Sequence, residues 1–183
     1  KILKSGVKLV QLRPQTAKYN LTKNIALRLH EQIRALEAIL MLNGKVSQFE
    51  SSIFQGLHLN RVEASKYFER PISKKHLLST SCHNLEELKH AIKIKADFAY
   101  ISPVKRTNSH PDSPSLGWEG LRKMVQRSSI PVFALGGLSD LDIISAREIG
   151  CQGIAMQSAL WNHANQKEYM REIYNSLRYL DST

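Results

Sequence analysis

Short apolar runs recur along the chain and are separated by longer stretches with a different periodicity. An apolar run of this length, bounded by polar or turn-forming residues, is typical of a strand buried on both faces of a sheet. The runs follow one another at intervals of roughly 20 to 30 residues, which is the spacing of a repeated strand–helix unit. The seven predicted strands are residues 7–13, 38–43, 56–60, 77–81, 98–102, 132–137 and 153–158.

The stretches between these runs carry the period of amphipathic helices. The clearest is 84–94, in which Leu85, Leu88, Ala91 and Ile92 share one face and Asn84 is placed to cap the first turn. A second helix is predicted over 139–150, from a capping Ser139 to a terminating Gly150, and a last one over 165–180.

Strands that alternate with helices predict a parallel sheet with right-handed crossovers. Polar or glycine residues recur where the predicted strands end, which favours a closed (β/α)8 TIM barrel over an open doubly wound sheet. Seven units are one short of that barrel. Residues 1–6 read like the end of a helix, so we expect that the first βα unit was removed or belongs to a longer parent chain. The prediction is one barrel domain over residues 1–183.

Composition narrows the class of protein. The chain has 183 residues, of which 42% are hydrophobic and 23% charged, enough apolar content for one globular core and too little contiguity for a membrane span. Cys82 and Cys151 have no disulfide framework or zinc spacing around them, and we expect a cytoplasmic protein with reduced cysteines.

The charge of the chain points to an anionic ligand. Lys and Arg number 26 against 16 Asp and Glu, a formal net charge of +10. The basic residues are spread along the chain without a basic tail or interleaved aromatic residues, which favours a phosphorylated small molecule over a nucleic acid. The sequence predicts no contact with a membrane.

A phosphate site in a (β/α)8 barrel is built from the loops after the last two strands and a helix N-terminus. Gly136 and Gly137 at the end of the sixth predicted strand, and Gln157 and Ser158 at the end of the seventh, offer small residues and backbone N–H groups at that place. The segment 107–115 is rich in Pro and Ser, and its composition fits a mobile lid and a plain surface loop equally well.

His58 alternates with Leu57 and Leu59 in the third predicted strand. It is interpreted either as a ligand contact inside the barrel or as a hydrogen-bonded core histidine.

These segments together resemble the thiamine-phosphate synthase/TenI superfamily over essentially the whole chain. The resemblance rests on ordered pieces at compatible spacing: Gln11-Leu12-Arg13, Leu42-Asn43, Gly56-Leu57-His58-Leu59, Ser81-Cys82-His83-Asn84, Ser102-Pro103-Val104, Ala134-Leu135-Gly136-Gly137 and Gly150-Cys151-Gln152-Gly153. It implies a (β/α)8 barrel that forms a homodimer and binds thiazole phosphate. In the synthases it further implies an aminopyrimidine diphosphate, Mg²⁺ and release of pyrophosphate.

The resemblance also implies roles for individual residues. Gln11, Arg13 and Asn43 correspond to the pyrimidine-diphosphate contacts, and Ser81 corresponds to the serine beside the pyrimidine. Arg13 can hold a diphosphate with two parallel hydrogen bonds. Glu63 falls at the position of an acidic Mg²⁺ ligand.

Thr107, Ser109 and His110 correspond to the lid of the family. The resemblance as a whole implies that Arg13, Ser81 and His110 take part in catalysis. His58, Gly136, Gly137, Gln157 and Ser158 complete the implied ligand contacts.

Three positions depart from the family's pattern. Gln15 and His110 stand where the family has lysine, and Gly44 replaces an aspartate that binds the metal. Lys18, Lys105 and Arg106 are hypothesised replacements for the lost positive charge. Pro103 stands at the catalytic histidine of the TenI tautomerase, and since proline cannot transfer a proton that activity is disfavoured.

Two functions follow. The first is a transferase that couples hydroxymethylpyrimidine diphosphate to thiazole phosphate in thiamine biosynthesis. The alternative is a non-catalytic module that binds thiazole phosphate within a larger Nudix fusion protein. The segments Ser109-His110-Pro111 and Leu116-Gly117-Trp118 resemble a barrel domain fused behind Nudix hydrolases of the MutT type.

Overall fold

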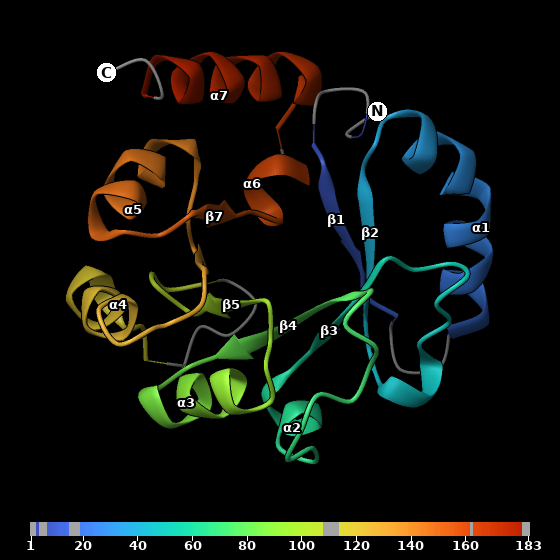
Figure 1. Ribbon diagram of the computed structural model, residues 1–183. Coiled ribbons are helices and arrows are strands. Elements are labelled where there is room, and N and C mark those ends of the chain that lie inside the picture. The colour runs from blue at the N-terminus through green and yellow to red at the C-terminus, as the bar shows by residue number, and fades with distance from the viewer. Residues whose placement is uncertain (1–2, 4–6, 15–18, 108–113, 162, 181–183) are drawn as a thin grey trace.

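A curled sheet of seven parallel strands forms the centre of the molecule (Figure 1). The computed structural model describes residues 3, 7–14, 19–107, 114–161 and 163–180. The strands pair in chain order, from β1 with β2 to β6 with β7, and every pair is parallel. Their bounds are β1 Leu9–Leu12, β2 Ile39–Asn43, β3 Gly56–Leu59, β4 Leu77–Cys82, β5 Phe98–Ile101, β6 Val132–Leu135 and β7 Gly153–Ala155.

All seven predicted strands are confirmed, and helices surround the outer face of the sheet (Figure 1). The predicted cap of the helix over 84–94 is present, since the Asn84 side chain accepts a hydrogen bond from the Glu87 N–H group. Gly150 ends the helix before it in the left-handed region, as predicted for a C-terminal glycine. The helices are α1 Tyr19–Ala35, α2 Arg61–Ala64, α3 Leu85–Lys93, α4 Gly117–Val125, α5 Ile143–Ile149, α6 Ser158–Trp161 and α7 Gln166–Leu180, with short 3-10 helices η2 Val46–Gln48 and η3 Asp140–Asp142.

The sheet is a seven-stranded TIM-barrel-like half-barrel, in which β1 and β7 are the two edges. No pairing between β1 and β7 is formed among the described residues. The C-terminal helix α7 covers this side: Tyr169, Met170 and Ile173 pack in one cluster with Val7 before β1 and with Ile154 of β7. The chain therefore bridges the two edges with side chains where a closed barrel would use a strand.

Alternation along the strands separates two cores. In β2, Leu40 and Leu42 pack outward against the helices, while Met41 points to the inner cluster. The inner cluster also contains Phe98 and Tyr100 of β5, whose rings meet edge to face at 5.5 Å between centroids. Successive side chains of a strand point to opposite faces of the sheet, and here both faces are buried. The strands therefore appear in the sequence as continuous apolar runs.

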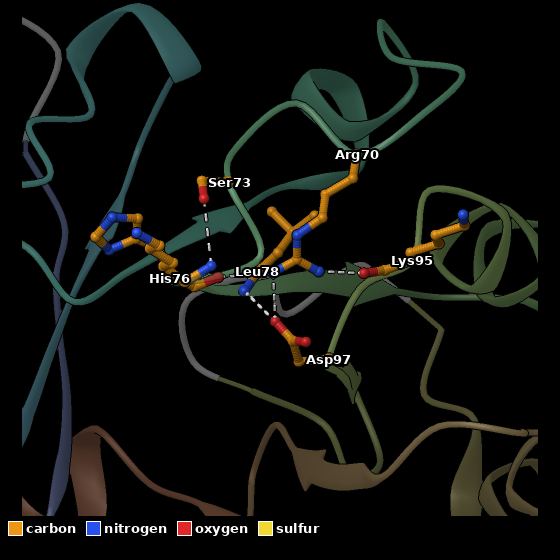
Figure 2. A network of polar contacts seen from close by, with 7 residues as sticks. Arg70, Ser73, His76, Leu78, Lys95 and Asp97 are labelled. Carbon is orange, nitrogen blue, oxygen red and sulfur yellow. Dashed lines mark hydrogen bonds and ion pairs between the residues drawn. The ribbon is translucent and has the colours of Figure 1, made fainter.

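A polar network holds the amino ends of β4 and β5 (Figure 2). The Arg70 guanidinium donates to the carbonyl oxygens of His76 and Lys95 and, at 2.7 Å, to the Asp97 carboxylate. Asp97 in turn accepts from the Leu78 N–H group at 2.7 Å. The network lies at the end of the barrel opposite to the predicted site, so it serves stability.

None of the helices in the described part of the chain is long and apolar enough to cross a membrane.

Candidate functional site

The carboxyl ends of the strands bring most of the predicted site residues to one rim. Because all strand pairs are parallel, residues at the ends of different strands meet at the same end of the sheet. Gln11 lies next to the last residue of β1 and Asn43 ends β2, and their side chains contact each other, with Asn43 Nδ2 lying 3.4 Å from Gln11 Oε1. The other residues at this rim are Arg13 after β1, His58 in β3, Ser81 in β4, Gly136 and Gly137 after β6, and Gln157 after β7.

His58 is the most buried polar side chain among those predicted for the site, with 3% of its surface exposed. Its Nδ1 atom lies 2.9 Å from Ser79 Oγ, and its Nε2 atom lies 2.9 Å from Ser81 Oγ. Burial, and secondarily the positive charge of Arg13, lowers the pKa of His58 to about 3. The imidazole is therefore neutral at neutral pH, with one ring nitrogen donating to a serine and the other accepting from one.

Both ring nitrogens of His58 are hydrogen-bonded within the core, as expected for a hydrogen-bonded core histidine, and its contact with a ligand stays a prediction. At the rim, the hydrogen bond from His58 fixes the position of the Ser81 hydroxyl. The register makes this possible, since His58 is paired with Ser79 in the sheet and Ser81 lies two residues further along the same face of β4. Ser81 remains partly exposed at the rim.

Tyr100 and Ser79 are part of the site although sequence reasoning did not single them out. The Tyr100 ring meets His58 edge to face at 5.4 Å, and its hydroxyl forms a hydrogen bond with Gln11. Burial raises the pKa of Tyr100 to about 12, while the Gln11 hydrogen bond opposes that rise. The available signal was alternation: Ser79 lies on the face of Ser81, and Tyr100 is the register partner of Ser81.

Arg13 lies just beyond β1 and is exposed. It forms no ion pair with any described residue, although its charge reaches His58. A guanidinium at the rim without a carboxylate partner is available to an anionic ligand.

The turn after β6 requires its two glycines. Gly136 has φ +101° and Gly137 has φ +68°, a region that other residues rarely adopt. A Cβ atom on Gly136 would lie 2.7 Å from Pro103 Cα, and one on Gly137 would collide with the Arg106 carbonyl oxygen. The turn is this tight because the loop after β5 packs on it, with Lys105 N donating to the Gly136 carbonyl oxygen at 2.9 Å.

The carboxylate of Asp142, shortly after this turn, already has partners within the chain. Asp142 accepts from the Ser139 N–H group at 3.0 Å and from Lys105 Nζ at 2.6 Å. Lys105 also lies 5.7 Å from the centre of the Trp118 ring. The side chain of Lys105, hypothesised as a replacement cation, is therefore engaged within the protein.

The residues at the implied Mg²⁺ position do not form a site that fits the ion. Gly44 has no side chain, and a Cβ atom added to it would lie 3.0 Å from the Gln48 Oε1 atom. The buried Glu63 carboxylate is 2.6 Å from Lys66 Nζ. Mg²⁺ takes an octahedral set of oxygen ligands from carboxylates, water and phosphate. Among the described residues, no group of three or more His, Cys, Asp or Glu side chains could hold a metal ion.

Several predicted residues lie outside the described part of the chain. Ser109 and His110 fall in the segment 108–113, and Gln15 and Lys18 fall in 15–18, so two lid residues, two departures from the family pattern and one hypothesised replacement cation have no structural description. Ser158 begins α6, but its side chain is likewise not described. Thr107 is half-buried and makes contacts within the chain.

A hollow of about 520 Å³ lies between α1 and the segment before β3 and is lined by residues that include Lys23, Arg28 and Glu50. It shares no residue with the predicted site.

Comparison with known proteins gives a consistent result. A family model described as thiamine monophosphate synthase matches residues 1–160. The chain is 31% identical over 155 residues to the putative thiamine-phosphate synthase 2 of Aquifex aeolicus, covering 85% of this chain and 83% of that one. It is 30% identical to the thiamine-phosphate synthase of Chloroflexus aurantiacus, covering 85% and 72%. The fold is similar to that of thiamine phosphate pyrophosphorylase from Pyrococcus furiosus, with a TM-score of 0.79 at 24% identity over 95% and 84% of the two chains.

Proposed function

This chain belongs to the thiamine monophosphate synthase family, and from that premise we propose that it is a transferase that joins hydroxymethylpyrimidine diphosphate to thiazole phosphate. The observation that carries the proposal is the rim itself. Gln11, Arg13, Asn43 and Ser81 come from three different strands and stand together at the carboxyl ends of the sheet.

The reaction has a simple balance of bonds. The lone pair of the thiazole nitrogen forms a bond to the methylene carbon of the pyrimidine, and the bond from that carbon to the diphosphate oxygen breaks. The electron pair of the broken bond leaves with pyrophosphate. Positive charge develops on the pyrimidine methylene and negative charge on the leaving group, so a fixed cation beside the diphosphate stabilises the transition state.

In this proposal Arg13 stabilises the leaving diphosphate, because its guanidinium is exposed and has no carboxylate partner among the described residues. Gln11 and Asn43 bind the pyrimidine diphosphate from the adjacent strand ends. Ser81 contacts the pyrimidine, and its hydroxyl is oriented by the neutral imidazole of His58.

The thiazole phosphate binds at the turn of Gly136 and Gly137, together with Gln157 and Ser158. The tight packing of that turn on the loop after β5 supports a preformed cradle of backbone groups. On the family resemblance, Thr107, Ser109 and His110 correspond to the lid of the site. A cytoplasmic homodimer completes the proposal, on the family resemblance alone.

A second candidate is a phosphate-binding module that has lost turnover and serves a fused Nudix domain. It is favoured by one set of contacts: Gly44 lacks the carboxylate of the family, and Glu63 is paired with Lys66. Each lost charge contact at a transition state costs several kcal/mol, about a hundredfold or more in rate.

Release of pyrophosphate from the purified chain, with each substrate alone and with both, tests the proposal. We expect turnover that needs both substrates and that falls by about a hundredfold or more in Arg13→Ala. Lys8→Ala is the matched control, because Lys8 is an exposed cation at the opposite end of the same strand. No turnover in a chain that still binds thiazole phosphate would reject the transferase and leave the module.

A further inference from the structure

We propose that this chain binds the diphosphate of its ligand without a divalent cation, by direct contact with side-chain cations at the carboxyl-end rim. The inference rests on the proposed function only in that the ligand carries a diphosphate group. It comes from the charges at the rim, where Glu63 and Asp142 are paired with lysines, whereas Arg13, Lys45 and Arg106 form no ion pair with a described residue.

Gly44, directly after β2, carries no negative charge, and a neighbouring side chain occupies the space that a longer side chain would need. Gly44 is followed by η2, and the Gln48 side chain folds back so that its Oε1 atom accepts from the Lys45 N–H group at 3.1 Å. The same oxygen lies 3.0 Å from where a Cβ atom on Gly44 would stand. A neutral amide thus fills the place from which a carboxylate would reach a metal ion.

The acidic position after β3 has been neutralised by the chain itself. Only 10% of the Glu63 side chain is exposed, and Lys66 Nζ lies 2.6 Å from Glu63 Oε1. Lys66 is three residues further along the chain, a spacing that places its ammonium group next to the Glu63 carboxylate. A divalent cation would have to displace this group and give up hydration water for a single protein carboxylate.

Further described carboxylates that follow strand ends are also engaged, and Asp140 after β6 accepts a hydrogen bond from the Tyr169 hydroxyl at 2.7 Å. Glu50 pairs with Lys23 at 2.8 Å, and Asp142 pairs with Lys105 at 2.6 Å. Glu87 accepts from the His83 N–H group at 2.7 Å. None of these groups is a bare carboxylate waiting for a metal ion.

Three basic side chains at the same rim have no carboxylate partner among the described residues. Arg13 follows β1, Lys45 follows β2 and Arg106 follows β5, and none of them forms an ion pair with a described residue. The chain as a whole carries a formal net charge of +10. A rim of this kind attracts a free diphosphate and repels Mg²⁺, so it is complementary to the anion and not to its metal complex.

Calorimetric titration of inorganic pyrophosphate into the whole chain tests this inference, once in excess EDTA and once in excess Mg²⁺. We expect binding in EDTA at least as tight as in Mg²⁺, because the metal ion withdraws free pyrophosphate from the protein. Binding that is about tenfold or more tighter in Mg²⁺ would overturn the inference, and so would absence of binding in both buffers.

Three variants identify the groups responsible. Arg13→Met should weaken binding in EDTA by about tenfold or more, whereas Lys8→Met removes the same charge at the opposite end of β1 and should leave binding unchanged. Equal losses in both would show a general charge effect and overturn direct contact at the rim. Glu63→Gln should show the same ratio of affinities in EDTA and in Mg²⁺ as the parent, and a loss of affinity seen only in Mg²⁺ would establish Glu63 as a metal ligand and overturn the inference. Thermal melts confirm that each variant is folded.

The readout does not depend on catalysis. A chain that binds pyrophosphate in EDTA but never releases it from the two substrates refutes the proposed transferase and leaves the metal-free site standing. A chain that turns over only with Mg²⁺ and binds pyrophosphate only with Mg²⁺ refutes the inference and leaves the transferase standing.

Discussion

Replacing His58 by glutamine should remove much of the loss of stability of this protein in mild acid. His58 is held between Ser79 and Ser81 in the barrel, and burial lowers its pKa to about 3 from an ordinary value of 6.5. Glutamine offers one donor and one acceptor to the same two hydroxyls but does not titrate.

The magnitude follows from linkage between protonation and unfolding. The folded pKa is lowered, so the stability from neutral His58 is fully present above the unfolded pKa of 6.5 and is lost as the pH falls towards about 3. Between about pH 7 and about pH 5 the unfolded chain takes up about 0.7 of a proton at this residue and the folded chain takes up almost none. The free energy of unfolding should therefore fall by about 2 kcal/mol on account of His58 alone.

Urea denaturation at the two pH values measures this difference for the parent and for His58→Gln. The variant should be less stable than the parent at neutral pH, because an imidazole fits the site better, but it should lose about 2 kcal/mol less on acidification. His30→Gln, at an exposed position of α1, controls for the exchange itself and should behave like the parent. Equal pH dependence in the parent and in His58→Gln would refute the reasoning, since it would mean that His58 titrates alike in both states.

Three more predictions follow from described contacts. Gly137→Ala should cost about 2 kcal/mol or more, since it adds a backbone collision to left-handed strain, whereas Gly117→Ala has a similar φ of +65° with nothing within 4 Å and should cost only about 1 kcal/mol; equal melting temperatures would contradict this. Arg70→Met should lower the free energy of unfolding by about 2 to 3 kcal/mol, because it removes the network of Figure 2, and it should not change ligand affinity, because that network lies at the amino ends of β4 and β5; an affinity change in calorimetry would show coupling to the rim. Burial raises the pKa of both Cys82 and Cys151 to about 11, so at about pH 8 thiol labelling should be slow in the native protein and fast in denaturant; fast native labelling would contradict their burial.

The arrangement of strands and helices was readable from the sequence because it depends on local periodicity. A strand buried on both faces must be apolar at consecutive positions, and a helix on a sheet must be apolar on one face. These rules placed all seven strands, and they placed α3 with its Asn84 cap and α5 with its terminal Gly150. The polar strand ends then followed from the parallel order, since parallel strands bring their carboxyl ends to one rim.

The states of the rim residues were decided only by the tertiary structure. Ser79 and Tyr100 join His58 through strand register, which couples residues more than 20 positions apart. The sequence does show that Gly44 lacks a carboxylate, but not that the Gln48 side chain fills its space.

Likewise, Glu63 was predicted as a metal ligand and Lys105 as a replacement cation from their residue types and positions in the sequence. In the folded chain Glu63 is paired with Lys66, and Lys105 is paired with Asp142. The sequence by itself determined which groups reach the rim, because backbone periodicity is local. Which of those groups remain available for a ligand depends on distances between side chains from different strands and loops, and these exist only once the chain has packed.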